Sequence, residues 1–385
     1  MKIVHLMLGN FYIDNYSYQE NMLPKFHKEM GHDVEIIASL VTFDENGKAT
    51  LLKQGGSYVS EHGIPVTRLE YRKGKYHRRM RHFVGLAECL EKAAPDILFI
   101  HNCQFCDIRV VVKYLRKHPG VKVFVDNHAD FSNSATNWLS KNVLHKIIWR
   151  RCAHLIEPYA SKFYGVLPVR VDFLRNVYKL PHDKCELLVM GADDTEVEAA
   201  ARPEIRAQIR QQYGLDENDF VIMTGGKIDK WKTQTLLLME AVQKIERPDV
   251  KLIVFGSVTQ ELKEQVNALA DGRKVQYIGW VQAKDSYKYF AAADLVVFPG
   301  RHSVFWEQVA AQGVPMLCKK WDGTTHVDVG GNVRFLTQDS AAEIEGEIRR
   351  LLENPEEHAK MKAIAQRDGM KTFSYRDIAC RSIEV

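Results

Sequence analysis

A glycine turn followed by two lysines is the segment of the second half best suited to bind an anion. Residues from 224 onward read TGGKIDKWKTQTLLLMEAV, so Gly226, Lys227 and Lys232 stand between an apolar run and a helical pattern. A glycine turn after a strand brings backbone N–H groups to an anion, and the two ammonium groups add positive charge. The Walker pattern GxxxxGK[ST] is absent. We therefore predict a diphosphate clamp that is not a P-loop.

A second candidate segment runs from 298 to 315 and reads FPGRHSVFWEQVAAQGVP. It predicts a strand end, a short loop and a helix that ends at Gly313. Five polar residues of the loop and the first helical turns could contact a ligand: Arg301, His302, Ser303, Glu307 and Gln308. Glu307 and Gln308 are placed to share hydrogen bonds with ribose hydroxyls. Glu307 also has a purely structural interpretation, as an acidic residue in an early helical turn.

Polar residues also follow two strands of the first half. Gly9 and Asn10 come directly after the apolar run 2–8, and His128 lies in the strand end FVDNHAD (124–130) beside Asp130. A histidine at a strand end is often only a capped structural residue, so both interpretations of His128 stay open from the residues alone. The other histidines, such as His5, we interpret as structural or surface residues.

Short apolar runs alternate with amphipathic ones along the whole chain. The expected strands are 2–8, 33–38, 97–100, 121–125, 220–223, 251–255, 275–278 and 295–298, and helices are expected over 17–30 and 233–245. Strands separated by helices predict parallel sheets with helices on both faces, and 385 residues suit two such domains. In open parallel sheets, ligands bind at the carboxyl ends of strands, which is where the polar residues above lie.

The order of these segments resembles retaining glycosyltransferases of the GT-B fold, in particular glycosyltransferase family 4. The family's glycine, basic residue and lysine pattern matches Gly226, Lys227 and Lys232, and its Gly-x-Pro segment matches 313–315. Weaker matches extend over almost the whole chain: GHDV (31–34), FVDNHAD (124–130), MGADD (190–194) and the closing FSYRDIACRSIEV. The family has two glutamates where this chain has Gly300 and Gln308. Glu307 is one residue off, about 100° round a helix.

The resemblance implies an α/β chain with two Rossmann-like domains whose parallel sheets face each other across a cleft. The implied divisions are an acceptor-side domain (1–193), a linker (194–216), a nucleotide-sugar domain (217–368) and a closing helix (369–385) that packs back on the first domain. Lys227 and Lys232 would hold the diphosphate and act in catalysis, and Gly9 and Asn10 would approach the donor. His128 would reach the transferred sugar. Gln308 could still contact the ribose, and the loop 301–303 would replace the missing first glutamate.

The implied reaction is a retaining transfer of a hexose-type sugar from a UDP-sugar or GDP-sugar, without cofactor or metal, to a saccharide or lipid-linked saccharide acceptor. This would fit the synthesis of a surface polysaccharide. The alternative is a non-catalytic, nucleotide-binding subunit of a partner enzyme. A nucleotide-sugar epimerase is possible on the same fold. A dinucleotide-dependent oxidoreductase is disfavoured, because neither glycine turn has the pattern GxGxxG.

Composition and charge restrict the expected binding partners and the expected location in the cell. A net charge of +4 excludes a global nucleic-acid footprint, and no apolar run is long enough for a transmembrane helix. An odd number of scattered cysteines, 7, favours reduced thiols in the cytoplasm, including the pair Cys103 and Cys106. Two basic stretches, 71–82 and 141–151, are either solvated helix faces or contacts with an anionic membrane. We expect a cytoplasmic protein, peripheral on the inner face of the membrane if the second interpretation holds.

Overall fold

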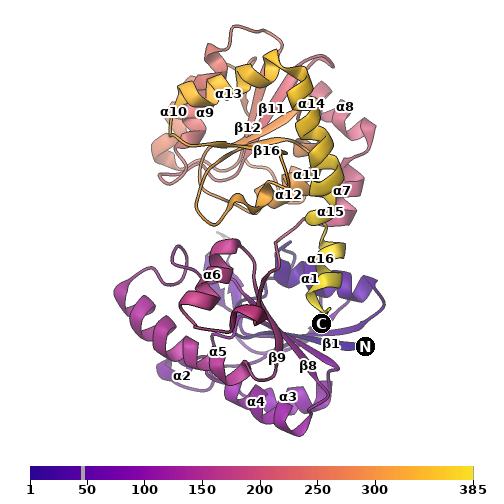
Figure 1. The fold of residues 1–385 in the computed structure, drawn as a ribbon, viewed down its shortest axis with the longest axis vertical. Coiled ribbons are helices and arrows are strands. Elements are labelled where there is room, and N and C mark those ends of the chain that lie inside the picture. Colours follow the sequence, from indigo (N-terminus) through magenta and orange to yellow (C-terminus); the bar gives the residue numbers. More distant parts are fainter. Residues whose placement is uncertain (45–47, 385) are drawn as a thin grey trace. The chain divides into compact units, whose positions relative to one another are not determined.

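The computed structural model describes residues 1–44 and 48–384. These residues form two compact units (Figure 1). Unit 1 contains residues 1–189 and the residues from 378 onward, and unit 2 contains residues 190–377. In each unit, helices flank a central sheet.

Unit 1 is built on an eight-stranded sheet in the order β10-β9-β8-β7-β1-β2-β6-β5. The pairings are parallel except for β5 with β6. The strands are β1 (Lys2–Met7), β2 (Asp33–Ala38), β5 (Gly56–Val59), β6 (Pro65–Arg68), β7 (Ile97–His101), β8 (Lys122–Asn127), β9 (Ala160–Gly165) and β10 (Cys185–Leu187). A separate antiparallel pair joins β3 (Val41–Phe43) to β4 (Ala49–Leu51).

Helix α4 (Ile108–Lys117) of unit 1 shows how an apolar stripe faces the core. In α4, Ile108, Val111, Val112 and Leu115 are buried, at the i, i+3, i+4, i+7 spacing of a core-facing helix. The helices are α1 (Gln19–Glu29), α2 (Lys75–Met80), α3 (Leu86–Ala93), α4 (Ile108–Lys117), α5 (Arg150–Ile156), α6 (Pro168–Asn176) and α16 (Tyr375–Ser382), and the turns over Ser140–Trp149 are π-helical. The last turns of α16 belong to unit 1, which the chain re-enters at residue 378.

Unit 2 has a six-stranded parallel sheet in the order β13-β12-β11-β14-β15-β16. Its strands are β11 (Phe220–Gly225), β12 (Val250–Phe255), β13 (Val275–Tyr277), β14 (Leu295–Phe298), β15 (Met316–Lys319) and β16 (Val333–Leu336). This is the strand order 3-2-1-4-5-6 of doubly wound sheets, in which the order reverses between the first and fourth strands. The carboxyl ends of β11 and β14 are therefore the expected ligand site of this unit.

Helices cover both faces of the second sheet. Helix α9 packs with α10 and α13 in one layer, and α11 packs with α7, α8 and α12 in another. Their bounds are α7 (Asp194–Ala200), α8 (Pro203–Gln212), α9 (Gln234–Lys244), α10 (Lys263–Leu269), α11 (Ser286–Ala291), α12 (Phe305–Ala311), α13 (Ala341–Glu353), α14 (Pro355–Ile364) and α15 (Met370–Thr372). The predicted α/β class with parallel sheets is confirmed.

Candidate functional site

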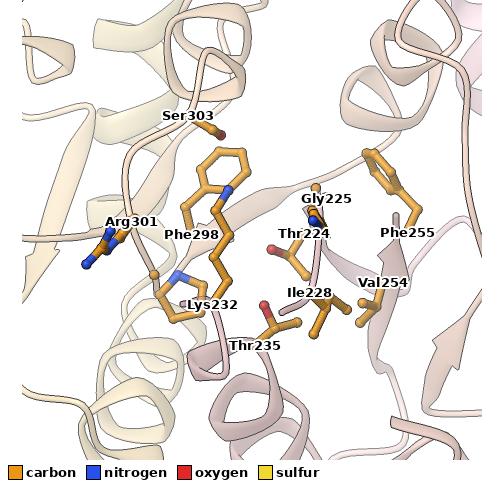
Figure 2. A pocket seen from close by; sticks show the side chains of 14 residues that line it. Thr224, Gly225, Ile228, Lys232, Thr235, Val254, Phe255, Phe298, Arg301 and Ser303 are labelled. Carbon is orange, nitrogen blue, oxygen red and sulfur yellow. The ribbon is translucent and has the colours of Figure 1, made fainter. Parts of the chain in front are cut away.

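A pocket lies at the carboxyl ends of β11 and β14, where the strand order of unit 2 reverses (Figure 2). One wall is the turn after β11 with the start of α9, and the other is the loop after β14. Its lining includes five of the predicted site residues: Gly226, Lys227, Lys232, Arg301 and Ser303. The enclosed space is about 20 Å³, which suits roughly one water molecule. A diphosphate bound here would therefore lie across the opening.

Two glycines let the backbone of this turn fold tightly. Gly226 has φ 123°, a conformation that side-chain-bearing residues rarely adopt. Gly256, in the loop after β12, lies so close that a Cβ on it would stand 1.9 Å from the Gly226 carbonyl oxygen. A side chain at Gly225 would meet the Phe255 ring at 2.3 Å. The turn can thus present its backbone to a ligand only because these positions are glycine.

The two predicted lysines have different surroundings. Lys232 is half-buried, and burial lowers the pKa of its ammonium despite the nearby Asp229. Within the described chain, no hydrogen bond or ion pair of the Lys232 ammonium is found, although the pocket is at its side (Figure 2). Lys227 is exposed, with its ammonium 3.7 Å from the Asp229 carboxylate. A partly desolvated cation without a partner is the group of this pocket that gains most from an anion.

The loop after β14 adds a guanidinium and a hydroxyl. Arg301 is exposed and stacks over the Trp231 ring at 4.8 Å, which joins the two walls of the pocket. Ser303 lines the pocket and accepts the backbone N–H of Trp306 through its carbonyl. Helix α12 then begins at Phe305. Arg301 and Ser303 therefore line the pocket, and their contact with a donor remains a prediction.

Glu307 points into unit 2 and is fully buried. Its Oε1 accepts hydrogen bonds from Nε2 of His302 and Nε2 of His326, each at 2.8 Å. Burial would raise the pKa of this carboxyl, but the two imidazoles outweigh it and hold the pKa well below its usual range. Glu307 thus anchors the loop through His302. Neither residue lines the pocket as described above, and the carboxylate that was expected near the ribose serves here as an internal support.

Gln308 is also not among the residues that line the pocket. It is buried, and its amide donates to the Ser286 hydroxyl at 2.9 Å and to the Gln312 carbonyl oxygen at 3.3 Å. The spacing that predicted a ribose contact did not show these partners, because Ser286 lies on α11, 22 residues earlier in the chain.

In unit 1 the strand order reverses between β1 and β7, and the predicted residues gather there. A Cβ on Gly9 would lie 2.0 Å from the Asn102 carbonyl oxygen, so the loops after β1 and β7 touch at this glycine. Asn10 donates a short hydrogen bond to Glu20. The backbone N–H of His128 donates to Asn102 Oδ1 at 2.9 Å. Gly9, Asn10 and His128 therefore all lie at the carboxyl ends of the strands of this sheet.

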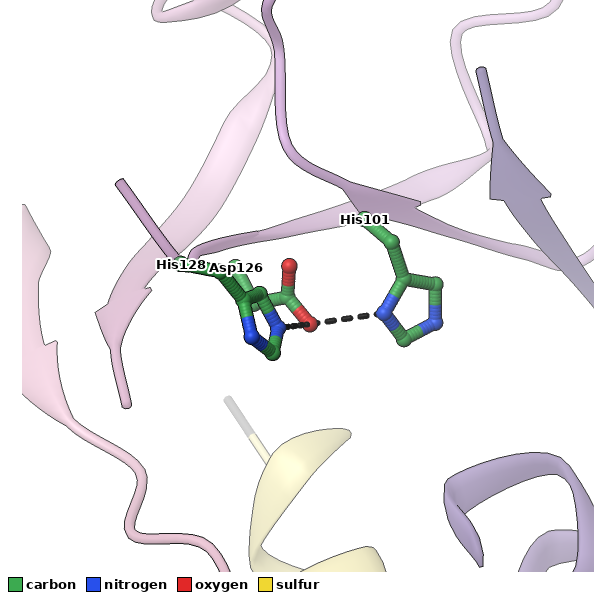
Figure 3. A group of neighbouring side chains, drawn as sticks. All are labelled: His101, Asp126 and His128. Carbon is green, nitrogen blue, oxygen red and sulfur yellow. Dashed lines mark hydrogen bonds and ion pairs between the residues drawn. The ribbon is translucent and has the colours of Figure 1, made fainter. Parts of the chain in front are cut away.

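His128 is held by carboxylates. Its Nε2 lies 3.2 Å from Asp126 Oδ2 and 3.7 Å from Glu20 Oε1. Burial lowers the pKa of His128, but Glu20 and Asp126 outweigh it, and the net shift is upward. Asp126 is fully buried and also accepts from His101 Nδ1 at 2.7 Å (Figure 3). Burial opposes its ionisation, yet the two imidazoles hold its pKa well below the usual range.

Sequence reasoning missed Asp126, His101, Glu20 and His326. Asp126 stood inside the motif FVDNHAD, and its place at a strand end was the available signal. The groups His101–Asp126–His128 and His302–Glu307–His326 each bring three potential ligand atoms within 4.8 Å of one another. In each group a carboxylate oxygen already lies within hydrogen-bond or ion-pair distance of two ring nitrogens. Ring protons therefore account for the geometry, and transfer without a metal remains a prediction.

The cysteines are free thiols in the part of the chain that the structure describes. Cys103 is buried, which raises the pKa of its thiol to about 12. Cys106 is hydrogen-bonded to Cys152 rather than to Cys103, and this bond, with His82 and Arg109, lowers its pKa. Among the described residues, no helix has the length and apolar character needed to cross a bilayer.

The sequence of unit 2 matches a known family model. Residues 205–368 match the family described as glycosyl transferases group 1. This segment is therefore similar to group 1 glycosyltransferase domains. A glycosyltransferase from Methanocaldococcus jannaschii is 22% identical over 157 residues, which are 40% of this chain and 40% of that protein. The chain thus spans less than half the length of this curated relative. The matched segment includes the pocket with Lys232.

Solved structures agree over nearly the whole chain. The structure of Anabaena HepE in complex with UDP has a TM-score of 0.68 at 20% identity and covers 99% of this chain and 98% of its own. The UDP-GlcNAc 2-epimerase from Neisseria meningitidis has a TM-score of 0.62 at 14% identity, with 100% and 99% covered. The predicted GT-B fold is confirmed. Because the same fold includes an epimerase, the fold alone does not specify the reaction.

Proposed function

We propose that this chain is a retaining glycosyltransferase that moves a hexose-type sugar from a UDP-sugar or GDP-sugar to a saccharide or lipid-linked saccharide, without a metal ion. The observation that supports it best is the pocket of the group 1 domain. A glycine turn meets Lys232 there, at the carboxyl ends of β11 and β14, and the Lys232 ammonium has no partner among the described residues. This arrangement suits a leaving diphosphate, whose charge grows in the transition state.

The proposed roles follow from the surroundings of each residue. Lys232 and the turn at Gly226 neutralise the diphosphate, and Lys227 and Arg301 add charge at the exposed rim. His128 contacts the transferred sugar, with Asn10 and Gly9 beside it. Attack from the face of the leaving group, through an oxocarbenium-like state, would preserve the anomeric configuration. Backbone N–H groups and lysines then do what a divalent ion does in other transferases.

Binding of a nucleoside diphosphate tests the donor half of this proposal. We expect one of UDP and GDP to raise the Tm of the full chain, equally with and without EDTA, whereas NAD should not. At about one hundred times its Kd, a ligand stabilises by roughly 2.7 kcal/mol. Stabilisation that EDTA abolishes would contradict the metal-independent clamp. Binding without consumption of any donor sugar would favour the non-catalytic subunit.

The acceptor half of the proposal rests on an exposed aromatic and basic surface of unit 1, comprising Phe131, Trp138, Leu139, Lys141, Lys146, Ile147 and Arg151. Trp138 is 72% exposed and Ile147 is 61% exposed. Residues 131–156 contain no Asp or Glu. Aromatic and basic side chains without acidic neighbours suit the interface of an anionic bilayer. We propose that this surface holds the enzyme at a membrane where a lipid-linked acceptor resides, in the synthesis of a surface polysaccharide.

Liposome binding distinguishes a membrane contact from a solvated helix. Replacing both Trp138 and Ile147 with Ser should weaken cosedimentation with vesicles containing phosphatidylglycerol at least several-fold. Arg78→Glu with Arg79→Glu tests the other basic stretch, since both side chains are exposed. Arg81 is excluded from that test, because its guanidinium is buried against the Gly9 and Gln104 carbonyls. Unchanged binding of both variants would contradict the membrane proposal.

A further inference from the structure

A chain of hydrogen bonds runs through the interior of unit 1 and ends at His128. It links His27, His5, His101 and Asp126 in that order, and all four side chains have zero exposure. Nε2 of His27 lies 2.9 Å from the Ala379 carbonyl oxygen, and its Nδ1 lies 3.0 Å from His5 Nε2. Nδ1 of His5 lies 2.9 Å from His101 Nε2, and His101 Nδ1 lies 2.7 Å from Asp126 Oδ2.

Adjacent elements place these side chains on one face of the sheet. His5 on β1 is in register with Phe99 of β7, and His101 stands two residues further along β7, so both rings project from the same side. His101 is in register with Asp126 of β8. His27 comes from α1, and Ala379 from α16. The rings of His27 and His101 each stack on the His5 ring with centroids 5.2 Å apart.

The hydrogen bonds that link these side chains need one proton more than three neutral imidazoles supply. Both ends are acceptors, since a carbonyl oxygen has no proton to give and an ionised carboxylate has none. Four links need four protons: Ala379 to His27, His27 to His5, His5 to His101, and His101 to Asp126. Three neutral imidazoles carry only three. The fourth must reside on a ring or on the carboxyl of Asp126.

The surroundings decide where this proton resides. Asp126 is a poor host, because the imidazoles beside it hold its pKa well below the usual range. Burial lowers the pKa of His5 and lowers that of His27 to about 4. His101 Nδ1 lies 2.7 Å from the Asp126 carboxylate. A positive charge on the His101 ring would therefore be compensated by that carboxylate.

We propose that this hydrogen-bonded chain holds one extra proton at pH 7.5, as an imidazolium at His101, which makes His101 the positioning residue for Asp126 and His128. His101 donates from Nδ1 to Asp126 and from Nε2 to His5, His5 donates from Nε2 to His27, and His27 donates from Nε2 to Ala379. The carboxylate thereby stays ionised and fixed, so it can orient the His128 ring. The role of His128 on the sugar rests on the proposed function, whereas the proton count does not.

The Ser382 hydroxyl is needed only when the hydrogen-bonded chain lacks the extra proton. Its hydroxyl lies 2.8 Å from the Ala379 carbonyl and 3.1 Å from His27 Nε2. If the extra proton leaves, His101 still donates to Asp126, but the two links between the imidazoles reverse and His27 no longer donates to Ala379. Ser382 must then turn from Ala379 to donate to His27 Nε2. The charged state does not need this hydroxyl, but the neutral state does. Other titratable groups near the chain are Glu20, His32, Tyr164 and Arg170.

Nitrogen NMR of the full chain, labelled with ¹³C and ¹⁵N in histidine and free of donor and acceptor, tests the proposal at pH 7.5. Through-bond correlations assign each ring without mutation. We expect both nitrogens of His101 to be protonated, and His5 and His27 to be protonated only at Nε2. Three neutral rings protonated at Nδ1 would overturn the proposal. Three neutral rings protonated at Nε2 would place the proton on Asp126 and would also overturn it.

A conservative variant supplies the second readout. Ser382→Ala removes the donor that only the neutral state needs, so His101 should lose its second proton at a higher pH than in the wild type. No change in that midpoint, or a shift to lower pH, would contradict the assignment. Neither measurement depends on turnover. Failure of the proton chain and failure of the transferase proposal are therefore distinguishable.

Discussion

Lys232→Met should lower kcat for donor turnover by about 10²–10³-fold, the usual effect of removing one preorganised charge donor from a developing anion. The reason is that Lys232 is half-buried and unpartnered among the described residues, so its charge is available to the diphosphate. The stability of the fold should be unchanged or slightly higher, because a partly desolvated ammonium is removed. Steady-state kinetics and thermal unfolding of the same preparations measure both effects.

Substitutions of two other lysines serve as comparisons for the loss of activity in Lys232→Met. Lys227→Met should cost less than Lys232→Met, because the Lys227 side chain is 62% exposed and its ammonium has Asp229 at 3.7 Å. Lys244→Met is the matched control, since this exposed residue ends the same helix α9 far from the pocket residues in sequence. Equal losses in Lys232→Met and Lys244→Met would contradict a specific role for Lys232.

Asp126→Asn should destabilise unit 1 by about 3–5 kcal/mol, the usual cost of leaving a buried charge without its partner. Asp126 is the only carboxylate in contact with the His101 ring among the described residues, and both side chains have zero exposure. Asp33→Asn, at the exposed start of β2, should stay within about 0.5 kcal/mol of the wild type. Denaturant unfolding of the three proteins measures these differences.

The pH dependence of this effect has a defined sign. The pKa of Asp126 is lower in the folded than in the unfolded chain. Its contribution is therefore fully present above the unfolded value of about 3.9 and is lost as pH falls toward the folded value. The gap between wild type and Asp126→Asn should narrow below about pH 4. A gap that widens there would contradict an ionised Asp126.

The sequence predicted strands from continuous apolar runs, and the strands predicted in this way agree with the structure. Residues 33–38 and 295–298 are β2 and β14 as predicted, and helix α9 lies within the predicted 233–245. Continuous apolar runs identify strands buried on both faces. The prediction did not include β3, β4, β5, β6, β9, β10, β15 or β16. Exposed residues break the apolar pattern in β5, β6 and β10, whereas β15 is buried throughout but only four residues long.

The sequence predicted those parts of the candidate site that depend on local sequence, but not the contacts between residues far apart in the chain. The glycine turn and the loop after β14 stand at strand ends, and the parallel sheet brings them into one pocket. The orientation of Glu307 was not predictable, because it depends on His326, which follows the next strand, β15. The same holds for His5, interpreted as an ordinary structural residue, whose partners come from α1 and β7.

Donor consumption is the most direct test of the proposed transferase activity. The full chain is incubated with UDP-sugars and GDP-sugars and a panel of saccharide and lipid-linked acceptors, in EDTA, and the products are followed by proton NMR. We predict that one donor is converted to its nucleoside diphosphate and that the product keeps the anomeric configuration, with both signals strongly reduced in Lys232→Met. An inverted product would contradict the retaining mechanism. Tight binding of UDP or GDP with no donor consumed would contradict the transferase itself and would favour a nucleotide-binding subunit.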